Sequence, residues 1–395
     1  MSHEKASDYL PLCAETPSMP DTMIDVAPPP APHRTATHKQ RSGVLHLLNA
    51  TVGIGLLAVP HTFATCGLVG GLAVHVAVVA ATLRGTRTLL HTADRLQAHS
   101  LEEVARKSLV APGEAVVRAC VVLAGVGTCV AETVALADVA TAWLPQSRAA
   151  VLVGLSCLVL GPLSVASHGL SDLTCVSTLA CVAYVTLTCG VALMAVADPV
   201  PQASWSPLPS VSALVSGASL SLFAYLCTPL VFHVRAELHA PEDAWTVCVA
   251  AAGLAAAVYV VVGVGACVRF GAVHGNVMED LLAADTRETT SLVLFVALSV
   301  CLSYPLPLFA AHRALRAPNT QGATVAIVVL VTALALLAER LDRVLTWMGA
   351  LPATVLVYVL PSALAVRTDP QASRCGAGAY ALGGVALAAY SLLAA

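Results

Sequence analysis

Residues 49–60 read NATVGIGLLAVP, and three structural interpretations of this stretch compete. Residues 49–51 fit the acceptor pattern for N-glycosylation. Gly53 and Gly55 resemble two thirds of a phosphate-binding glycine loop. Pro60 closes an apolar run that suits a buried helix. The rest of the chain decides between these interpretations.

The composition of the chain favours an integral membrane protein. Of its 395 residues 57% are hydrophobic and only 11% are charged, with a mean hydropathy of +0.81. Soluble proteins are about a quarter charged, so this chain has too few charges to cover a soluble surface. The net charge of -3, without a basic domain or a zinc motif, argues against nucleic acid binding.

The thirteen cysteines are scattered singly, mostly inside apolar runs. They have no metal-ligand spacing, so we interpret them as small buried hydrophobic residues and expect no metal cofactor from them.

Residues 1–40 differ from the rest, because they are polar and rich in proline. Such a segment cannot bury a core, so we expect a disordered cytoplasmic tail. It lacks the pattern of a secretory signal peptide. Residues 9–12, YLPL, fit a tyrosine-based sorting signal, although four-residue matches are common by chance.

Residues 41–395 are predicted to form one transmembrane domain. A bilayer core of about 30 Å needs about 20 apolar residues in a helix. The sequence contains eleven such candidates: 43–64, 67–83, 118–143, 149–163, 172–197, 211–233, 244–268, 289–311, 321–338, 344–366 and 375–394. A short N-capped helix is also expected at Ser100, with acidic residues in its first turn.

The basic residues predict the orientation of these spans. With a cytoplasmic N-terminus, fifteen of the 20 lysines and arginines lie in cytoplasmic segments and five in outer loops. This bias agrees with the positive-inside rule. An odd number of spans would then place the C-terminus outside.

The opening stretch lies inside the span 43–64, which removes two of its interpretations. Asn49 is at membrane depth, beyond the reach of a glycosyltransferase, and the glycine loop lacks a preceding strand and a third glycine. Glycine and proline inside a membrane helix favour a break that lines a cavity or binds a ligand. A small-residue face for helix packing is the alternative.

The sixth span, 211–233, has a similar character. Residues 216–221 read SGASLS, and Pro229 follows them. A broken helix at the first and sixth positions is typical of transporters built from two inverted repeats of five helices. The sequence therefore predicts an all-α membrane protein with a five-plus-five inverted repeat and an eleventh helix.

Four segments in the same order resemble the amino acid/auxin permease family, which includes sodium-coupled neutral and proton-coupled amino acid transporters. Residues 48–60 look like the family's first-helix motif, Asn followed by G-x-G-[IL]-L and then Pro. Residues 100–103, residues 223–238, and residues 303–309 with Arg313 are similar to the segments at helices 2, 6 and 8. The resemblance extends from about Ser42 to the last span. It implies a LeuT-like fold and secondary active transport of amino acids.

The resemblance also implies which residues bind substrate and ion. The substrate's amino and carboxylate groups would meet the broken parts of helices 1 and 6. The corresponding residues are Thr51, Val52, Gly53, Ile54, Gly55, Ala218, Ser219 and Phe223. In the sodium-coupled branch, Asn49 and a helix-8 hydroxyl, here Ser299 or Ser303, would belong to a sodium site. That branch often has Thr at this position, so proton coupling stays open.

Glu132 departs from the family, whose members more often carry an aromatic residue there. It is the deepest acidic residue in the chain, near the middle of the span 118–143. Such charges are costly in a membrane and are usually functional. We therefore expect Glu132 to carry the coupling proton or to receive a cationic substrate group; a protonated, hydrogen-bonded structural role is the alternative. Asp138 is expected at the outer end of the same span as an interface anchor or gate. His75 and His233 are expected to bond between helices, with a proton relay as the alternative.

These features favour an ion-coupled amino acid transporter that works by alternating access, with H+ or Na+ as the coupling ion and no other cofactor. A transporter-like amino acid sensor that signals through its tail is the alternative. No constellation for an enzyme is visible. We expect a monomer in the lipid bilayer of the plasma membrane or of an acidic organelle such as a vacuole or lysosome.

Overall fold

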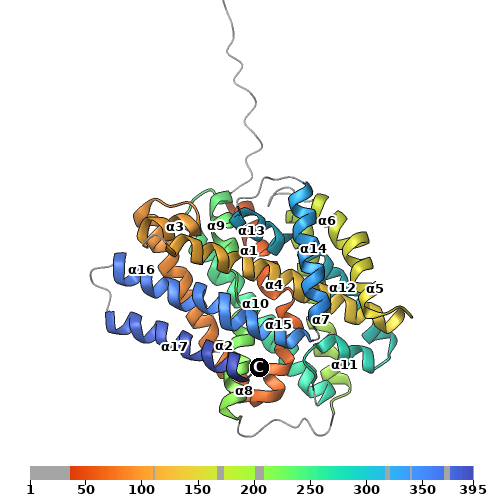
Figure 1. The fold of residues 1–395 in the computed structure, drawn as a ribbon. Helices are drawn as coiled ribbons and strands as arrows, with labels where there is room; N and C mark the ends of the chain where they lie inside the picture. Colours follow the sequence, from red (N-terminus) through yellow and green to blue (C-terminus); the bar gives the residue numbers. More distant parts are fainter. Residues whose placement is uncertain are drawn as a thin grey trace, which may run out of the picture. The chain divides into compact units, whose positions relative to one another are not determined.

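The computed structural model describes residues 36–109, 112–166, 173–200, 209–271, 273–315, 321–338, 340–368 and 374–394. These residues form helices with short connections and include no β-strand (Figure 1). Most of the predicted tail, with the possible sorting signal, falls outside the described residues, whereas residues 36–40 belong to the first helix.

The first predicted span is broken, as expected. Helix α1 (Ala36–Val52) ends just before Gly53, and α2 begins two residues later and extends over Gly55–Leu96. Pro60 lies inside α2 rather than at its end. A second irregularity at Gly67, with φ 69° and ψ 173°, uses a backbone conformation that favours glycine and kinks α2 at the first residue of the second predicted span.

The sixth predicted span is broken as well. Helix α8 (Val211–Ala224) and helix α9 (Thr228–Glu237) are separated by residues 225–227. Pro229 occupies the first turn of α9, where its missing N–H costs no helical hydrogen bond. The prediction of breaks in helices 1 and 6 is therefore confirmed.

Most of the other spans form longer helices than predicted, whereas α7 and α14 are each one residue shorter, and two spans are interrupted by π-helical turns. They are α4 (Pro112–Trp143), α5 (Arg148–Leu155) with η1 (Ser156–Leu160) and α6 (Gly161–Ala166), α7 (Leu173–Ala197), α10 (Asp243–Phe270), α12 (Arg287–Ser303), α13 (Pro305–Leu315), α14 (Gln321–Leu337), α15 (Leu341–Met348) with η2 (Gly349–Ala353), η3 (Val355–Val359) and α16 (Leu360–Thr368), and α17 (Arg374–Ala394). In the described part of the chain, nine helices are long and apolar enough to cross a bilayer, and α14 is a shorter apolar helix. The count of eleven spans and the internal repeat remain predictions.

Two short helices lie outside these spans. Helix α3 (Leu101–Ser108) is the predicted N-capped helix, because the Glu103 N–H donates a 3.1 Å hydrogen bond to Ser100 Oγ. The Glu103 carboxylate accepts hydrogen bonds from the His99 N–H and Lys107, which lower its pKa to about 2. Helix α11 (Val277–Ala283) was not predicted.

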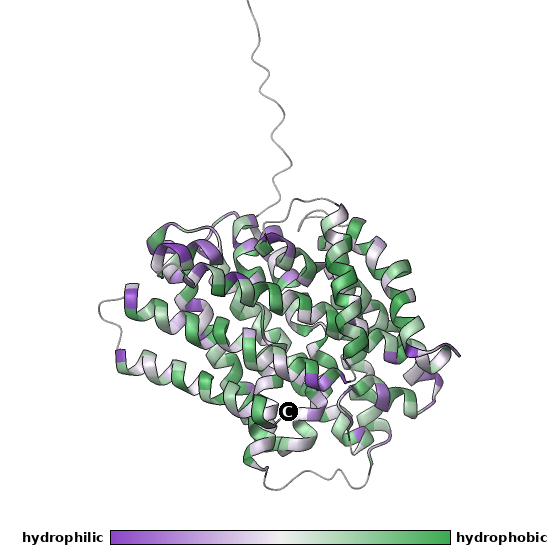
Figure 2. Cartoon of the chain, viewed as in Figure 1, coloured by the Kyte–Doolittle hydropathy of each residue, from purple (hydrophilic) through white to green (hydrophobic). Residues whose placement is uncertain are grey.

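The distribution of apolar side chains fits a bilayer environment. Large apolar residues such as Leu158, Leu193 and Leu382 are exposed on the outer helices, where they would contact acyl chains. Hydrophilic residues gather near α3 and α9 at one end of the helices and around α11 at the other (Figure 2). Inside, α2 packs against α8 and α10, while α4 packs against α13. This packing brings the two breaks into the core.

Candidate functional site

The two helix breaks meet at one tyrosine. The Tyr259 hydroxyl of α10 lies 2.5 Å from the carbonyl oxygen of Thr51 and 2.8 Å from that of Ala224. Each carbonyl belongs to the last turn before a break, where helical carbonyls lack intrahelical partners. The hydroxyl therefore satisfies otherwise orphaned backbone groups of both broken helices.

Glycine at position 55 allows this close approach. A Cβ atom there would lie 2.8 Å from the Ala224 Cβ and 2.9 Å from the Tyr259 hydroxyl, closer than ordinary contacts. The second glycine of the opening motif therefore serves the contact between the two breaks. In this structure the motif therefore lets the backbones of the two broken helices approach each other closely.

A cavity of about 60 Å³ adjoins the breaks. This volume has room for water molecules. Its walls come from α1, the first break, α4, the second break, α9, α12 and α13, and they include Asn49, Gly53, Ile54, Glu132, Cys227 and Ser303. The structure thus gathers residues from four stretches that are far apart in the chain, 49–54, 124–132, 226–230 and 303–310.

Glu132 and Ser303 are hydrogen-bonded in this cavity. The Ser303 hydroxyl donates a 2.8 Å hydrogen bond to Glu132 Oε1. Glu132 Oε2 is buried and has no hydrogen-bond partner among the described residues. No lysine, arginine or histidine is among the described residues that line the cavity. The carboxyl group therefore has one oxygen engaged and one available to a proton, an ion or a ligand.

Asn49 is held from the side of α7. Its Oδ1 accepts a 2.9 Å hydrogen bond from the Tyr184 hydroxyl, and its Nδ2 donates to Ser177 Oγ at 3.3 Å. His46, one turn earlier on α1, lies 3.0 Å from the same Ser177 hydroxyl. This buried network fixes the orientation of the amide, with its oxygen facing a hydroxyl donor.

The remaining predicted residues of the first break have distinct positions. Thr51 donates its hydroxyl to the Leu47 carbonyl at 2.7 Å, and its own carbonyl meets the Tyr259 hydroxyl. Val52 is fully buried in the apolar core and does not line the cavity. Gly53 and Ile54 line the cavity, whereas Gly55 contacts α8.

The predicted residues on α8 lie away from this cavity. Ala218, Ser219 and Phe223 are not among its lining residues. The Ser219 hydroxyl lies 2.5 Å from that of Ser391 on α17. Phe223 and Ala218 pack in or against the apolar core. Ser299 is also separate, because its hydroxyl donates to the Ala180 carbonyl at 3.2 Å. Ser299 and Ser303 both belong to α12, which forms part of the eighth predicted span. Of these two candidate hydroxyls, only that of Ser303 reaches the cavity.

The other polar residues singled out from the sequence have structural partners. His75 Nδ1 lies 3.2 Å from the Tyr225 hydroxyl at the second break, and its ring stacks on Phe63. Asp138, near the end of α4, pairs with Arg148 at 3.2 Å. His233 Nδ1 lies 3.0 Å from a carbonyl in its own helix, at Pro229, so the expected bond between helices is not the one formed here.

Three residues at the site were not predicted from the sequence. Ser177 and Tyr184 are seven residues apart, so they share one face of α7, and polar groups inside an apolar span were the available signal. Tyr259 stands alone in an apolar run of α10, and only its partners in space identify its role.

A second, larger polar cavity of about 430 Å³ lies beside the start of α2. Its walls come from α2, α8 and the beginning of α15, and they include Thr62, Thr65, Ser212, Ser216, Arg343 and Thr346. Hydroxyl groups share these walls with His61, Arg340 and Asp342. The cavity is therefore suited to polar solutes and water.

Comparisons with known proteins agree with this architecture. The family described as "transmembrane amino acid transporter protein" matches residues 36–374. A manganese transporter of Eremococcus coleocola, in complex with an aromatic bis-isothiourea substituted compound, has a similar structure with a TM-score of 0.54. The two chains are 11% identical over 92% of this chain and 96% of the other. A mutant of that transporter gives a TM-score of 0.52 at 10% identity over the same shares. The predicted fold class, an all-α membrane protein of the LeuT-like type, is confirmed.

Proposed function

The chain belongs to the family of transmembrane amino acid transporter proteins, and from this premise we propose that it carries out ion-coupled secondary active transport of amino acids by alternating access. The observation that carries the proposal is the meeting of two helix breaks at Tyr259, beside a cavity that contains Glu132. Broken helices at membrane depth persist where they line a cavity or bind a ligand.

We place the amino acid's charged groups at the first break. The N-terminus of α2 presents backbone N–H groups with a partial positive charge, which favour a carboxylate. The carbonyl end of α1 favours an ammonium group. Gly53 and Ile54 line the cavity between these two ends. The backbone of the break would therefore recognise the amino and carboxylate groups that all amino acids share. Thr51, Val52 and Gly55 would help to shape the break. When the cavity is enlarged, Ala218, Ser219 and Phe223 on α8 would bound the substrate.

We assign ion coupling to Glu132, with the proton as the coupling ion. An ionised carboxylate at mid-membrane costs about 3 kcal/mol even by the milder estimates. Glu132 has a single described hydrogen-bond partner, Ser303, and no described basic residue beside it in the cavity. Binding and release of a proton would therefore change the polarity of the cavity. Sodium bound near Asn49 and Ser303 is the alternative, with Ser299 as a more distant candidate.

The polar cavity beside α2 provides a route from one side of the membrane in this proposal. Its hydroxyl groups and Arg343 would attract a zwitterionic solute before it reaches the breaks. The break residues would act as hinges when access changes sides. The excess of basic residues in one set of loops supports a cytoplasmic N-terminus.

The test is uptake of a mixed panel of labelled amino acids into proteoliposomes, with either a proton gradient or a sodium gradient imposed. We expect accumulation driven by protons and its loss in Glu132→Gln. Asp138→Asn is the matched control, because it removes a carboxylate from the same helix at a position paired with Arg148. This control should retain gradient-driven uptake.

Other outcomes have defined meanings. Accumulation driven only by sodium, retained in Glu132→Gln and lost in Asn49→Ala, would refute proton coupling and place an ion site at Asn49. Binding of an amino acid without any accumulation would refute transport and favour the sensor function.

A further inference from the structure

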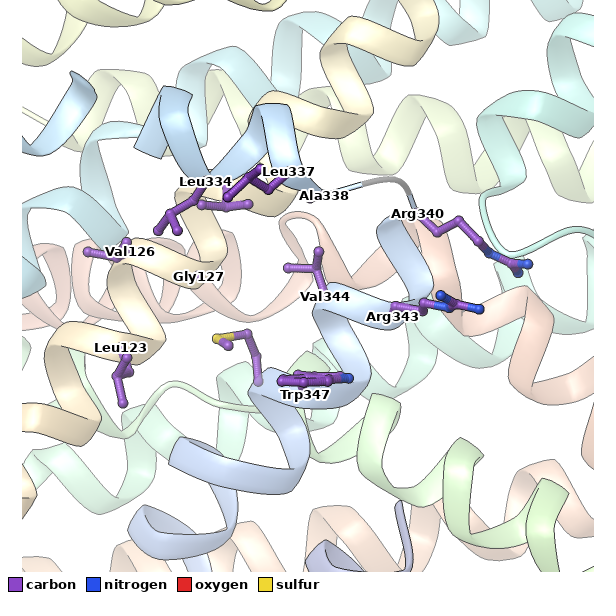
Figure 3. A pocket seen from close by; sticks show the side chains of 12 residues that line it. Leu123, Val126, Gly127, Leu334, Leu337, Ala338, Arg340, Arg343, Val344 and Trp347 are labelled. Carbon is purple, nitrogen blue, oxygen red and sulfur yellow. The ribbon is translucent and has the colours of Figure 1, made fainter. Parts of the chain in front are cut away.

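A groove of about 530 Å³ lies between α4, α14 and α15, apart from the central cavity. Its walls are largely apolar, with Leu123 and Val126 from α4, Leu334 from α14, and Val344 and Trp347 from α15 (Figure 3). Its volume falls in the range of small-molecule sites in proteins. None of its lining residues takes part in the cavity at the helix breaks.

The groove opens toward the surroundings of the helices. Leu123 is 51% exposed, Leu337 is 80% exposed and Trp347 is 49% exposed. In a chain that spans a bilayer, exposed apolar side chains on the outer helices contact acyl chains. A tryptophan at such a position is also typical of the membrane interface. The groove is therefore continuous with the lipid-facing surface.

One end of the groove is cationic. Arg340 and Arg343 lie on the side away from Leu123 and Val126 (Figure 3). Arg340 forms a bidentate ion pair with Asp342, with distances of 3.0 and 2.7 Å. Arg343 is exposed, and no acidic side chain among the described residues pairs with it. The arrangement joins an apolar groove to Arg343, a positive charge that no acidic side chain neutralises within the part of the chain that the structure describes.

We propose that this groove binds an anionic phospholipid, with an acyl chain along α4 and α14 and the phosphate at Arg343. Lipid chains surround the opening in a bilayer, so a chain fills the apolar part without selecting among lipids. Selectivity comes from the head group, because Arg343 offers donors that match phosphate and a charge that no described residue neutralises.

The position of α15 gives this site a structural consequence. One side of α15 faces the groove, while Arg343 and Thr346 line the polar cavity beside α2 and α8. Arg343 borders both spaces. A phosphate bound to it from the membrane side would hold this arginine at the wall between the lipid and the polar cavity.

Trp347 provides a direct probe of occupancy. In a variant with Trp143→Phe, Trp205→Phe and Trp245→Phe, Trp347 is the remaining tryptophan of the four in the chain. The full-length protein is reconstituted in phosphatidylcholine vesicles that contain a small fraction of lipid brominated along its acyl chains. Quenching of Trp347 fluorescence by brominated phosphatidylglycerol is compared with quenching by brominated phosphatidylcholine.

We expect brominated phosphatidylglycerol to quench with about fivefold higher relative affinity, the factor that one arginine near an anionic head group contributes. Arg343→Gln should remove this preference. Arg287→Gln is the matched control, because it removes one exposed arginine from the start of α12, and the preference should persist. Leu334→Phe tests the apolar part of the groove without adding a second tryptophan signal. This larger side chain should weaken quenching by both lipids.

Leu330→Phe is the control for that substitution, since Leu330 is exposed on α14 one turn away and does not line the groove. Equal quenching by the two brominated lipids would overturn the proposal and leave ordinary lipid contact at the surface. A preference that survives Arg343→Gln would overturn the assignment of the phosphate. Quenching by neither lipid, with crosslinked dimers, would show that a second copy of the chain covers the groove.

Discussion

The Ser303 hydroxyl donates a 2.8 Å hydrogen bond to Glu132 Oε1 across the interface of α12 and α4. The two residues are separated by 171 positions in the sequence. The bond joins the deepest acidic side chain to a hydroxyl that borders the helix breaks. Because this hydrogen bond lies in the cavity beside the helix breaks, Ser303 and Glu132 are the first residues at which to test the coupling mechanism.

Ser303→Ala should reduce gradient-driven uptake by about tenfold, because losing one hydrogen bond to a buried acidic group costs about 1–3 kcal/mol. Ser303→Thr keeps a hydroxyl and should restore part of the activity. Initial uptake rates in proteoliposomes provide the measurement. Ser299→Ala is the control, since Ser299 bonds to the Ala180 carbonyl instead. Equal losses in the Ser303→Ala and Ser299→Ala variants would contradict a specific role for Ser303.

Tyr259→Phe should lower the free energy of unfolding by about 1 kcal/mol, because it leaves the carbonyl groups of Thr51 and Ala224 without their shared donor. Substrate affinity should fall as well, because the two breaks lose their common anchor. Thermal unfolding in detergent and equilibrium binding measure the two effects. Tyr390→Phe, at an exposed position, is the control and should change neither the free energy of unfolding nor the substrate affinity. Unaltered substrate affinity in Tyr259→Phe would show that the Tyr259 hydroxyl does not shape the binding site.

Gly55→Ala should abolish most uptake, since its Cβ would lie 2.8 Å from the Ala224 Cβ and force the breaks apart. Overpacking of this kind costs about 1–3 kcal/mol. Gly253→Ala is the matched control, because a Cβ there meets nothing within 4 Å. That change should leave uptake intact and stabilise α10 slightly. Normal uptake by the Gly55→Ala protein would refute the requirement for close contact.

Asn49→Ala and Tyr184→Phe should impair uptake by amounts that do not add, because the Tyr184 hydroxyl donates to Asn49 Oδ1 at 2.9 Å. A double-mutant cycle on uptake rates measures this coupling, which contacting residues show at about 0.5–3 kcal/mol. Tyr358→Phe combined with Asn49→Ala provides a pair without this bond and should be additive. Strict additivity in the first pair would remove the network from the mechanism.

Helix α11 should loosen as pH rises above about 6.5, the usual pKa of histidine, and passes through the raised pKa of His274. His274 Nδ1 lies 2.5 Å from Asp280 Oδ1, and this carboxylate raises the pKa of His274 above its usual range. Stabilisation by the protonated pair is complete below the pKa of the unfolded state and is lost as pH passes the raised pKa. Burial raises the pKa of Asp280 and of nearby Glu279, while His274 lowers both.

Hydrogen exchange of a peptide covering Val277–Ala283, corrected for the intrinsic rate at each pH, measures this loosening. His274→Gln should remove the pH dependence, because the amide cannot gain the charge. His239→Gln is a control at another histidine. Identical corrected protection of the native protein below and above this pH range would rule out the predicted contribution of His274.

Much of the architecture follows from local chemistry. Apolar runs of bilayer length predict the spans, and the small residues around Gly53 and the Cys227–Pro229 segment predict the two breaks. The cap at Ser100 follows from three neighbouring residues. Local rules succeed here because each feature depends on residues within a few turns of one another. Helix ends were less accurate, since apolar composition alone does not mark where α2 and α4 extend beyond the membrane.

The sequence by itself determined a helical membrane protein with two broken helices and a buried acidic residue. Only the tertiary structure decided which groups meet. Ser303, rather than Ser299, reaches Glu132, Tyr259 joins the two breaks, and Tyr184 holds Asn49. These contacts depend on the rotation and crossing of helices that are far apart in the chain, with 35 to 208 residues between the partners. A single sequence records the period of each helix, but the direction in which a polar side chain faces depends on how its neighbours pack.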